Sequence, residues 1–159
     1  MTKKERDAKI RSYGKAPSEL RSALKKFPKK MWKYKPSINR WSVHEIIIHL
    51  ADSEANSFVR CRRFVAEPGK TVMAYDQDVW AQKLEYHRQS TDDALALFKA
   101  LRDSSYKLIR RLPDEAWSAT IEHPENGTMT FERWLEVYEE HTHKHIRQMK
   151  ANLEAWKKR

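Results

Sequence analysis

The segment from Phe131 to Met149 constrains the fold most strongly, because its apolar side chains recur at the spacing of an α-helix. At about 100° per residue, one stripe of this helix collects Val137, Tyr138, His141, His145, Gln148 and Met149. Imidazoles on a stripe that should be buried need partners for their ring nitrogens. Histidines at i and i+4 can reach one ion together, so His141 and His145 are predicted to be ligands of a divalent metal.

The composition favours an all-α protein. The chain has 159 residues, of which 40% are hydrophobic and only three are glycine, and it is long enough for a core of its own. No segment is apolar enough for a membrane span or a signal peptide, and Cys61 has no second cysteine to pair with. We therefore expect a cytoplasmic protein without a membrane partner.

The net charge of +10 is confined to the first quarter of the chain. Residues 1–40 contain 14 Lys and Arg and three acidic residues. Residues 41–159 contain 18 Lys and Arg and 19 acidic residues, so they are almost neutral. Such a basic segment can contact phosphates or an acidic surface. Because the remainder is neutral and no nucleic-acid-binding motif is present, we interpret the segment as a solvated helix face and do not expect a nucleic-acid partner.

Start and stop signals predict a four-helix bundle with long functional loops. Residues 1–15 are expected to form a basic N-terminal arm, and residues 16–159 a single bundle domain. Helices are predicted at about 17–27, 42–66, 90–112 and from 130 almost to the end of the chain. The third helix should bury a stripe formed by Ala94, Leu97, Leu101, Leu108 and Leu112.

Two signals fix helix starts, and two long connections separate the later helices. Ser42 and Glu45 form a capping box, and Ser90 starts the next helix. The connection at 67–89 has a helical turn around 76–82, and the one at 113–129 has a turn at Asn126-Gly127. Connections of this length in a bundle commonly carry a functional site.

A third metal ligand is expected, because catalytic zinc sites usually combine three protein ligands with an open position. His49 is the best candidate, since it lies in the middle of a helix on a polar stripe with Asp52, Ser53 and Asn56. The periodicity alone leaves open whether this stripe faces a metal or the solvent. Asp52 and Gln148 lie within reach of the predicted site and could orient a ligand imidazole.

The segment His44-Glu45-Ile-Ile-Ile-His49 superficially resembles the zinc-protease signature. That signature requires histidines four residues apart, whereas here the separation is five. The two rings would lie about 140° apart around the helix, and the capping box already uses Glu45. We reject the protease interpretation and expect His44 to be exposed.

The remaining histidines are interpreted mainly as surface residues. His123 precedes a proline in a loop and His87 lies just before the third helix, so either could also line a cleft. His143 should face the solvent, opposite the metal stripe. Trp134 and Tyr138 are assigned to the core.

Four separated segments resemble the DinB-like superfamily of bacterial proteins, and within it the YfiT-type metal-dependent hydrolases. These segments are Trp41–Glu54 (WSVHEIIIHLADSE), Tyr75–Ala81 (YDQDVWA), His123–Glu125 (HPE) and His141–Gln148 (HTHKHIRQ). The resemblance runs from about Trp32 to Asn152, and the order of the four motifs makes it fairly specific.

The resemblance implies an up-and-down-like four-helix bundle in which three histidines hold one nickel or zinc ion. The three match His49, His141 and His145, which places the polar stripe of His49 on the metal side. The sequence departs from the family at Glu54 and Lys144, where histidines are frequent, and neither change removes a ligand.

Asp76, Trp80 and His123 lie in the loop motifs and are expected to line the pocket with Asp52 and Gln148. Three functions remain open. In a hydrolase, metal-activated water would attack an amide- or ester-like bond, and His123 or Asp76 could move protons. In a transferase with a role like that of glutathione S-transferases, which several relatives imply, the ion would activate a small thiol. The third is a non-catalytic module with a closed metal site.

Several properties are not specified by the sequence. Imidazole ligands suit zinc, nickel, copper and iron, although zinc and nickel are expected from the resemblance. The substrate is expected to be a small molecule, with a thiol as one option, and the loops at 67–89 and 113–129 are expected to shape its pocket. Relatives of this fold often dimerise and the chain has six tryptophans, so a homodimer is expected.

Overall fold

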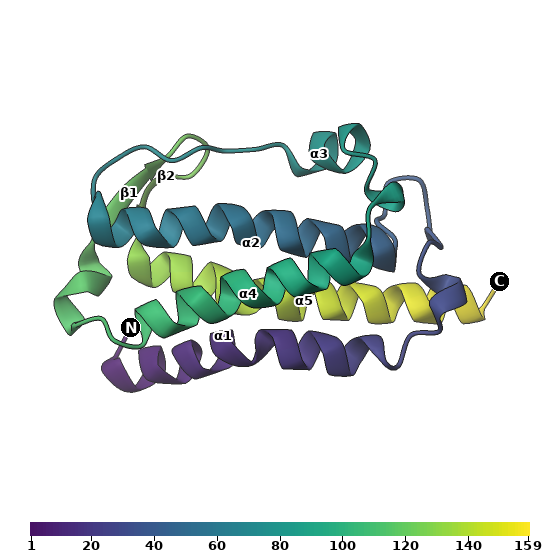
Figure 1. Ribbon diagram of the computed structural model, residues 1–159, viewed down its shortest axis with the longest axis horizontal. Helices are drawn as coiled ribbons and strands as arrows, with labels where there is room; N and C mark the ends of the chain where they lie inside the picture. Colours follow the sequence, from purple (N-terminus) through teal and green to yellow (C-terminus); the bar gives the residue numbers. More distant parts are fainter.

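Four long helices lie side by side in the computed structural model, which describes residues 1–159 (Figure 1). They are α1 (Lys3–Leu24), α2 (Val43–Ala66), α4 (Thr91–Ile109) and α5 (Phe131–Lys157). Both α1 and α2 pack against α4 and against α5. The prediction of an all-α four-helix bundle is confirmed, and no helix combines the length and apolar character needed to cross a membrane.

The helices do not alternate in direction. In Figure 1, α1 and α5 run toward one end of the bundle, while α2 and α4 both run toward the other. Helices that run in the same direction need a connection that returns along the bundle. Residues 67–90 provide it, and they include the short helix α3 (Gln77–Lys83) and a 3₁₀ turn (Tyr86–Arg88). The up-and-down arrangement implied by the resemblance is therefore wrong, whereas the expected helical turn near residue 76 is present.

The first helix is longer than predicted. Thr2 and Glu5 form a capping box at its start, and the helix continues through Pro17. Ile10 and Tyr13 are buried in the bundle, so residues 1–15 are not a separate arm. The predicted start at Pro17 is wrong because the packing of an apolar face compensates for the hydrogen bond that an interior proline removes.

The buried face of α4 also differs from the predicted stripe. Ser90 caps the helix as expected, but the helix ends at Ile109 and Leu97 is 47% exposed. The buried residues are Ala94, Phe98, Arg102, Ser105 and Ile109. The buried face therefore differs from the predicted leucine stripe. The difference arises because this face includes a buried arginine, which hydrophobicity alone does not predict.

Buried polar groups separate two apolar clusters of the core. Arg102 on α4 is fully buried and its Nη2 donates to Glu54 on α2 at 2.6 Å. The Tyr13 hydroxyl on α1 donates to the same carboxylate at 2.8 Å, and Arg102 donates to the Tyr138 carbonyl on α5 at 3.0 Å. One ion pair, with its hydrogen-bond partners, thus connects all four helices.

A two-stranded sheet closes one end of the bundle. Strand β1 (Thr120–His123) pairs antiparallel with β2 (Gly127–Thr130), and Gly127 has a φ of +67° in the predicted turn. Residues 69–72 of the crossover pair in parallel with β1. Strands of four residues are too short for periodicity to identify, so this sheet was not predicted. It places His123 beside the crossover.

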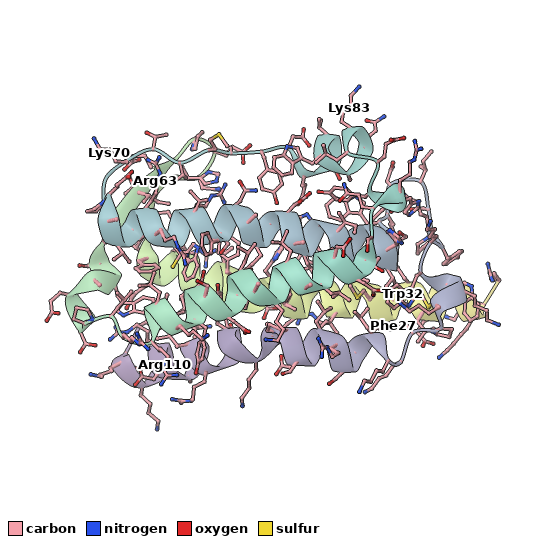
Figure 2. All side chains as sticks on the ribbon, viewed as in Figure 1. Phe27, Trp32, Arg63, Lys70, Lys83 and Arg110 are labelled. Carbon is pink, nitrogen blue, oxygen red and sulfur yellow. The ribbon has the colours of Figure 1, made fainter.

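The opposite end contains the remaining connection, from α1 to α2. This segment includes a 3₁₀ turn (Lys29–Met31). A further 3₁₀ turn (Asp114–Ser118) belongs to the connection between α4 and β1. Figure 2 shows Phe27 and Trp32 at the end where α5 terminates, and Arg63 and Lys70 near the sheet. The two long loops that were expected to shape a site both line one cavity beside α2.

Candidate metal centre

Three imidazoles meet inside the bundle. His49 comes from the middle of α2, and His141 and His145 come from successive turns of α5. The Nε2 atom of His141 lies 3.3 Å from Nε2 of His49 and 3.1 Å from Nε2 of His145. Four-coordinate zinc with bonds of about 2.0–2.1 Å would place two ligand nitrogens about 3.3 Å apart. The spacing fits ligands of one ion.

The proton positions on these rings also fit a bound cation. Nδ1 of His145 lies 3.0 Å from Oε1 of Gln148. An amide oxygen can only accept, so Nδ1 carries the proton and Nε2 offers a lone pair. A single Nε2–H on His141 could satisfy one neighbouring nitrogen but not both. Two nitrogen lone pairs would therefore face each other without a proton between them. A cation bound by all three nitrogens would remove this repulsion.

All three rings are held neutral. Burial is the main cause that lowers the pKa of His49 to about 3, and Lys144 and a protonated His145 act in the same direction. Burial lowers the pKa of His145 to about 4, and that of His141 lies well below its usual value because of burial and its two histidine neighbours. Neutral imidazole is the form that binds metals, so these pKa values favour metal binding at neutral pH.

The two residues expected to orient the ligands behave differently. Gln148 contacts His145, as predicted. Asp52 accepts a hydrogen bond from the Tyr86 hydroxyl at 2.6 Å, and no hydrogen bond joins it to the three imidazoles. The prediction for Asp52 is therefore wrong, because the 3₁₀ turn of the crossover lies over this carboxylate. Nδ1 of His49 is buried without a partner.

Two cavities adjoin the imidazoles. The first, of about 500 Å³, is lined by His49 and His141 together with Arg60, Asp76 and His123 from α2 and the two loops. Asp76 and His123 thus lie where they were expected. Trp80 does not line this cavity, and its ring instead packs against Tyr75 with centroids 4.6 Å apart.

The second cavity, of about 700 Å³, adjoins His141 and His145. Its wall includes Arg40, Lys144 and Arg147, so it is more basic than the first. The three imidazoles lie between the two cavities, and a metal ion held by them would be accessible to small molecules.

A family model of the DinB superfamily matches residues 13–149 of this chain. The chain belongs to the DinB superfamily. It is 26% identical over 147 residues to YfiT of Bacillus subtilis (strain 168), which is named as a metal-dependent hydrolase, and the match covers 92% of this chain and 83% of that protein. A relative from Oceanobacillus iheyensis with the same kind of name is 29% identical over 106 residues, which cover 67% of this chain and 61% of the relative.

A solved structure of YfiT from Bacillus subtilis is similar over nearly the whole fold. The TM-score is 0.88 at 25% sequence identity, with 96% of this chain and 87% of that chain covered. That protein is described as a probable metal-dependent hydrolase with an unusual four-helix bundle topology. In this DinB protein α2 and α4 run in the same direction, which is consistent with that description because consecutive long helices of a bundle more often run in opposite directions.

Of the three other histidines outside the cavities, His44 and His143 lie elsewhere than expected, whereas His87 is partly exposed as expected. His44 is buried rather than exposed, and its Nε2 lies 3.0 Å from the Gln89 carbonyl. His143 does not simply face solvent, since its Nε2 is 2.7 Å from a Glu19 oxygen on α1. His87 lies 2.7 Å from the Ser42 hydroxyl. These side chains pack between elements whose proximity the sequence does not show.

Sequence reasoning missed Arg60 in the first cavity and assigned Tyr138 to the core alone. Arg60 was not singled out, although it lies three turns after His49 on α2 and is only 9% exposed. Tyr138 was assigned to the core, and it does pack there, but its side chain also lines the cavity. The one available signal was the spacing of Arg60 from His49 along the helix, which is compatible with a common face.

Proposed function

We propose that this DinB protein is a metal-dependent hydrolase in which His49, His141 and His145 hold one divalent ion, zinc or nickel. The convergence of three neutral imidazoles at 3.1–3.3 Å carries the proposal. The names of relatives that span most of the chain support it.

The surroundings favour a catalytic ion over a structural one. Structural zinc sites are closed by a fourth protein ligand, whereas catalytic sites keep a position open. No further histidine, cysteine or carboxylate joins the cluster of three. Cavities adjoin the cluster on two sides, so small molecules have access to it.

When bound, the ion would supply Lewis-acid polarisation and activate water near neutral pH. The chain would contribute position and protons. Gln148 holds the ring of His145 in one orientation, and burial keeps all three ligand rings neutral. His123 lines the same cavity as His49 and His141, where it can donate a proton or a hydrogen bond to substrate.

The experiment combines elemental analysis with turnover. Purified protein should contain about one zinc or nickel per chain, and it should hydrolyse some members of a panel of activated esters and amides. His145→Ala should lose the metal and the turnover, whereas Lys150→Ala, on an exposed part of the same helix, should retain both.

Wild-type protein that contains no metal would contradict the metal centre. Metal-dependent conjugation of a small thiol to an electrophile, without ester or amide turnover, would replace the hydrolase with the transferase. Stoichiometric metal without either activity would favour the non-catalytic module.

A further inference from the structure

Arg60 is a buried cation without an anionic partner. Its side chain lines the first cavity and is 9% exposed. Nη1 donates to the Tyr138 hydroxyl at 2.9 Å and Nη2 donates to the Met73 carbonyl at 2.6 Å. No carboxylate forms an ion pair with it, whereas the other two buried arginines, Arg6 and Arg102, are both paired with carboxylates. Burial of an unpaired charge is unfavourable, so the position is suited to an anion from outside the chain.

His123 offers a second donor in the same cavity. Its Nδ1 accepts a hydrogen bond from the Glu125 backbone N–H at 3.2 Å and lies 3.1 Å from the amide nitrogen of Asn126. With Nδ1 acting as an acceptor, the neutral ring carries its proton on Nε2. Burial and the charge of Arg60 lower the pKa of His123, which favours this neutral form.

Tyr138 offers a third donor. Its oxygen accepts from Arg60, so its own proton is free for another acceptor. Burial raises its pKa, and the hydroxyl therefore remains protonated at neutral pH. The cavity thus contains one cation, Arg60, and two neutral hydrogen-bond donors, His123 and Tyr138. Both donors already accept a hydrogen bond from the protein, so their remaining N–H and O–H groups are free for a ligand.

The rim of this cavity has the opposite charge. Asp76, Asp78 and Glu125 line it and are exposed to solvent. Asp76 is partly engaged, because its Oδ1 accepts the backbone N–H groups of Asp78 and Val79. Solvent screens exposed carboxylates, but they still disfavour ligands with several negative charges and favour a cationic group at the rim.

We propose that this cavity binds the carboxylate of a small zwitterionic substrate through Arg60, His123 and Tyr138, with the substrate's amine at the acidic rim. Arginine suits a carboxylate because its planar guanidinium presents several donors. The substrate would then extend toward His49 and His141, which line the same cavity. This inference rests on the proposed function in taking the ligand to be the substrate of the three-histidine centre.

Three probes of similar size separate the contributions. Butyrate carries only the carboxylate, butylamine only the amine, and 4-aminobutyrate carries both. Binding of each to the purified protein is measured by calorimetry or by NMR titration. We expect 4-aminobutyrate to bind more tightly than butyrate, and Arg60→Met to weaken both at least tenfold without changing the binding of butylamine.

The matched control is Arg63→Gln. Arg63 lies three residues further along α2, outside the first cavity, and forms an exposed ion pair with Glu67. This variant should bind all three probes like the wild type. Arg60→Lys keeps the charge and should retain part of the carboxylate binding. If Arg60→Met does not fold, Arg60→Lys and His123→Gln provide the same comparison.

Two results would overturn the proposal: no binding of either carboxylate to the wild type, or equal binding to the wild type and Arg60→Met. Weaker binding of 4-aminobutyrate than of butyrate would overturn the zwitterion assignment. Metal content and ester hydrolysis are measured on the same samples. Hydrolysis without carboxylate binding would refute this inference alone, whereas carboxylate binding without metal or turnover would refute the proposed function alone.

Discussion

At the scale of single residues, the second ring nitrogen of each histidine determines how firmly the ring is oriented. Nδ1 of His145 is held by Gln148, while Nδ1 of His49 is buried without a partner. Partners of this kind fix the tautomer and the ring orientation of metal ligands. The metal centre therefore depends on Gln148 more than on the nearby Asp52, which binds Tyr86.

Replacement of Gln148 by Leu should lower metal affinity by about 10–100-fold, the usual effect of losing such a partner. Competition with a chromophoric chelator measures the affinity. Lys150→Leu, an exposed change on the same helix, serves as the control. An unchanged affinity in Gln148→Leu would show that the hydrogen bond does not orient the ligand.

Lowering the pH should destabilise the metal-free protein. The folded-state pKa values of His49 and His145 lie at about 3 and about 4, below the ordinary value of 6.5. Below pH 6.5 the unfolded chain therefore binds more protons than the folded one, so the free energy of unfolding falls with pH until the folded groups titrate. The loss for one imidazole between pH 7 and pH 5 is about 2 kcal/mol. Urea unfolding of chelator-treated protein at pH 7 and pH 5 measures it, and equal stabilities would contradict the burial of neutral rings.

At the scale of elements, α1 shows how packing can override a local signal. Pro17 suggested a helix start and residues 1–15 a separate basic arm, yet the helix is continuous from Lys3 to Leu24. Its inner face buries Ile10, Tyr13 and Leu20, while the charged residues lie mostly on the outer face. The apolar stripe decides the structure, because helices in proteins are stabilised mainly by the burial of such a face.

Deletion of residues 1–15 should therefore destabilise the bundle, not merely remove charge. The deletion removes Ile10 and Tyr13 from the second apolar cluster of the core. Each buried side chain of this size typically contributes about 2–5 kcal/mol. Urea unfolding of the shortened chain should show a large loss of stability or no cooperative transition. A Lys4→Gln variant, altered only on the exposed face, should unfold like the wild type.

At the scale of the whole molecule, the buried pair of Glu54 and Arg102 joins the four helices. Glu54 is 1% exposed and Arg102 is fully buried, and their partners Tyr13 and Tyr138 lie on α1 and α5. Arg102 donates to the Tyr138 carbonyl, three residues before His141 on α5. The relative position of α2 and α5, and with it the spacing of the imidazoles, depends on this packing.

Removal of one partner should be strongly destabilising. Arg102→Met would leave the Glu54 carboxylate buried without its counter-charge, a change that typically costs about 3–5 kcal/mol. Chemical denaturation measures the loss. The double variant with Glu54→Leu should recover much of it, because no uncompensated charge then remains. Additive losses in the double variant would contradict a direct coupling of the two residues.

The sequence by itself determined the helices and part of the site. The Ser42 capping box, the turn at Asn126-Gly127 and the spacing of His141 and His145 are local features, and local geometry follows from local sequence. A resemblance carried by four motifs added His49, which periodicity had left undecided. The orientation of His49 was open because the sequence of one helix does not show which of its polar faces packs against a neighbouring helix.

Only the tertiary structure decided the direction of the helices, the inclusion of residues 3–15 in the bundle and the surroundings of the three imidazoles. Arg60, His123 and Tyr138 come from α2, β1 and α5, and they share a cavity because the crossover and the sheet cover the same face of α2. Burial, missing counter-charges and fixed tautomers arise from contacts between residues distant in sequence. These contacts exist only after the helices have packed.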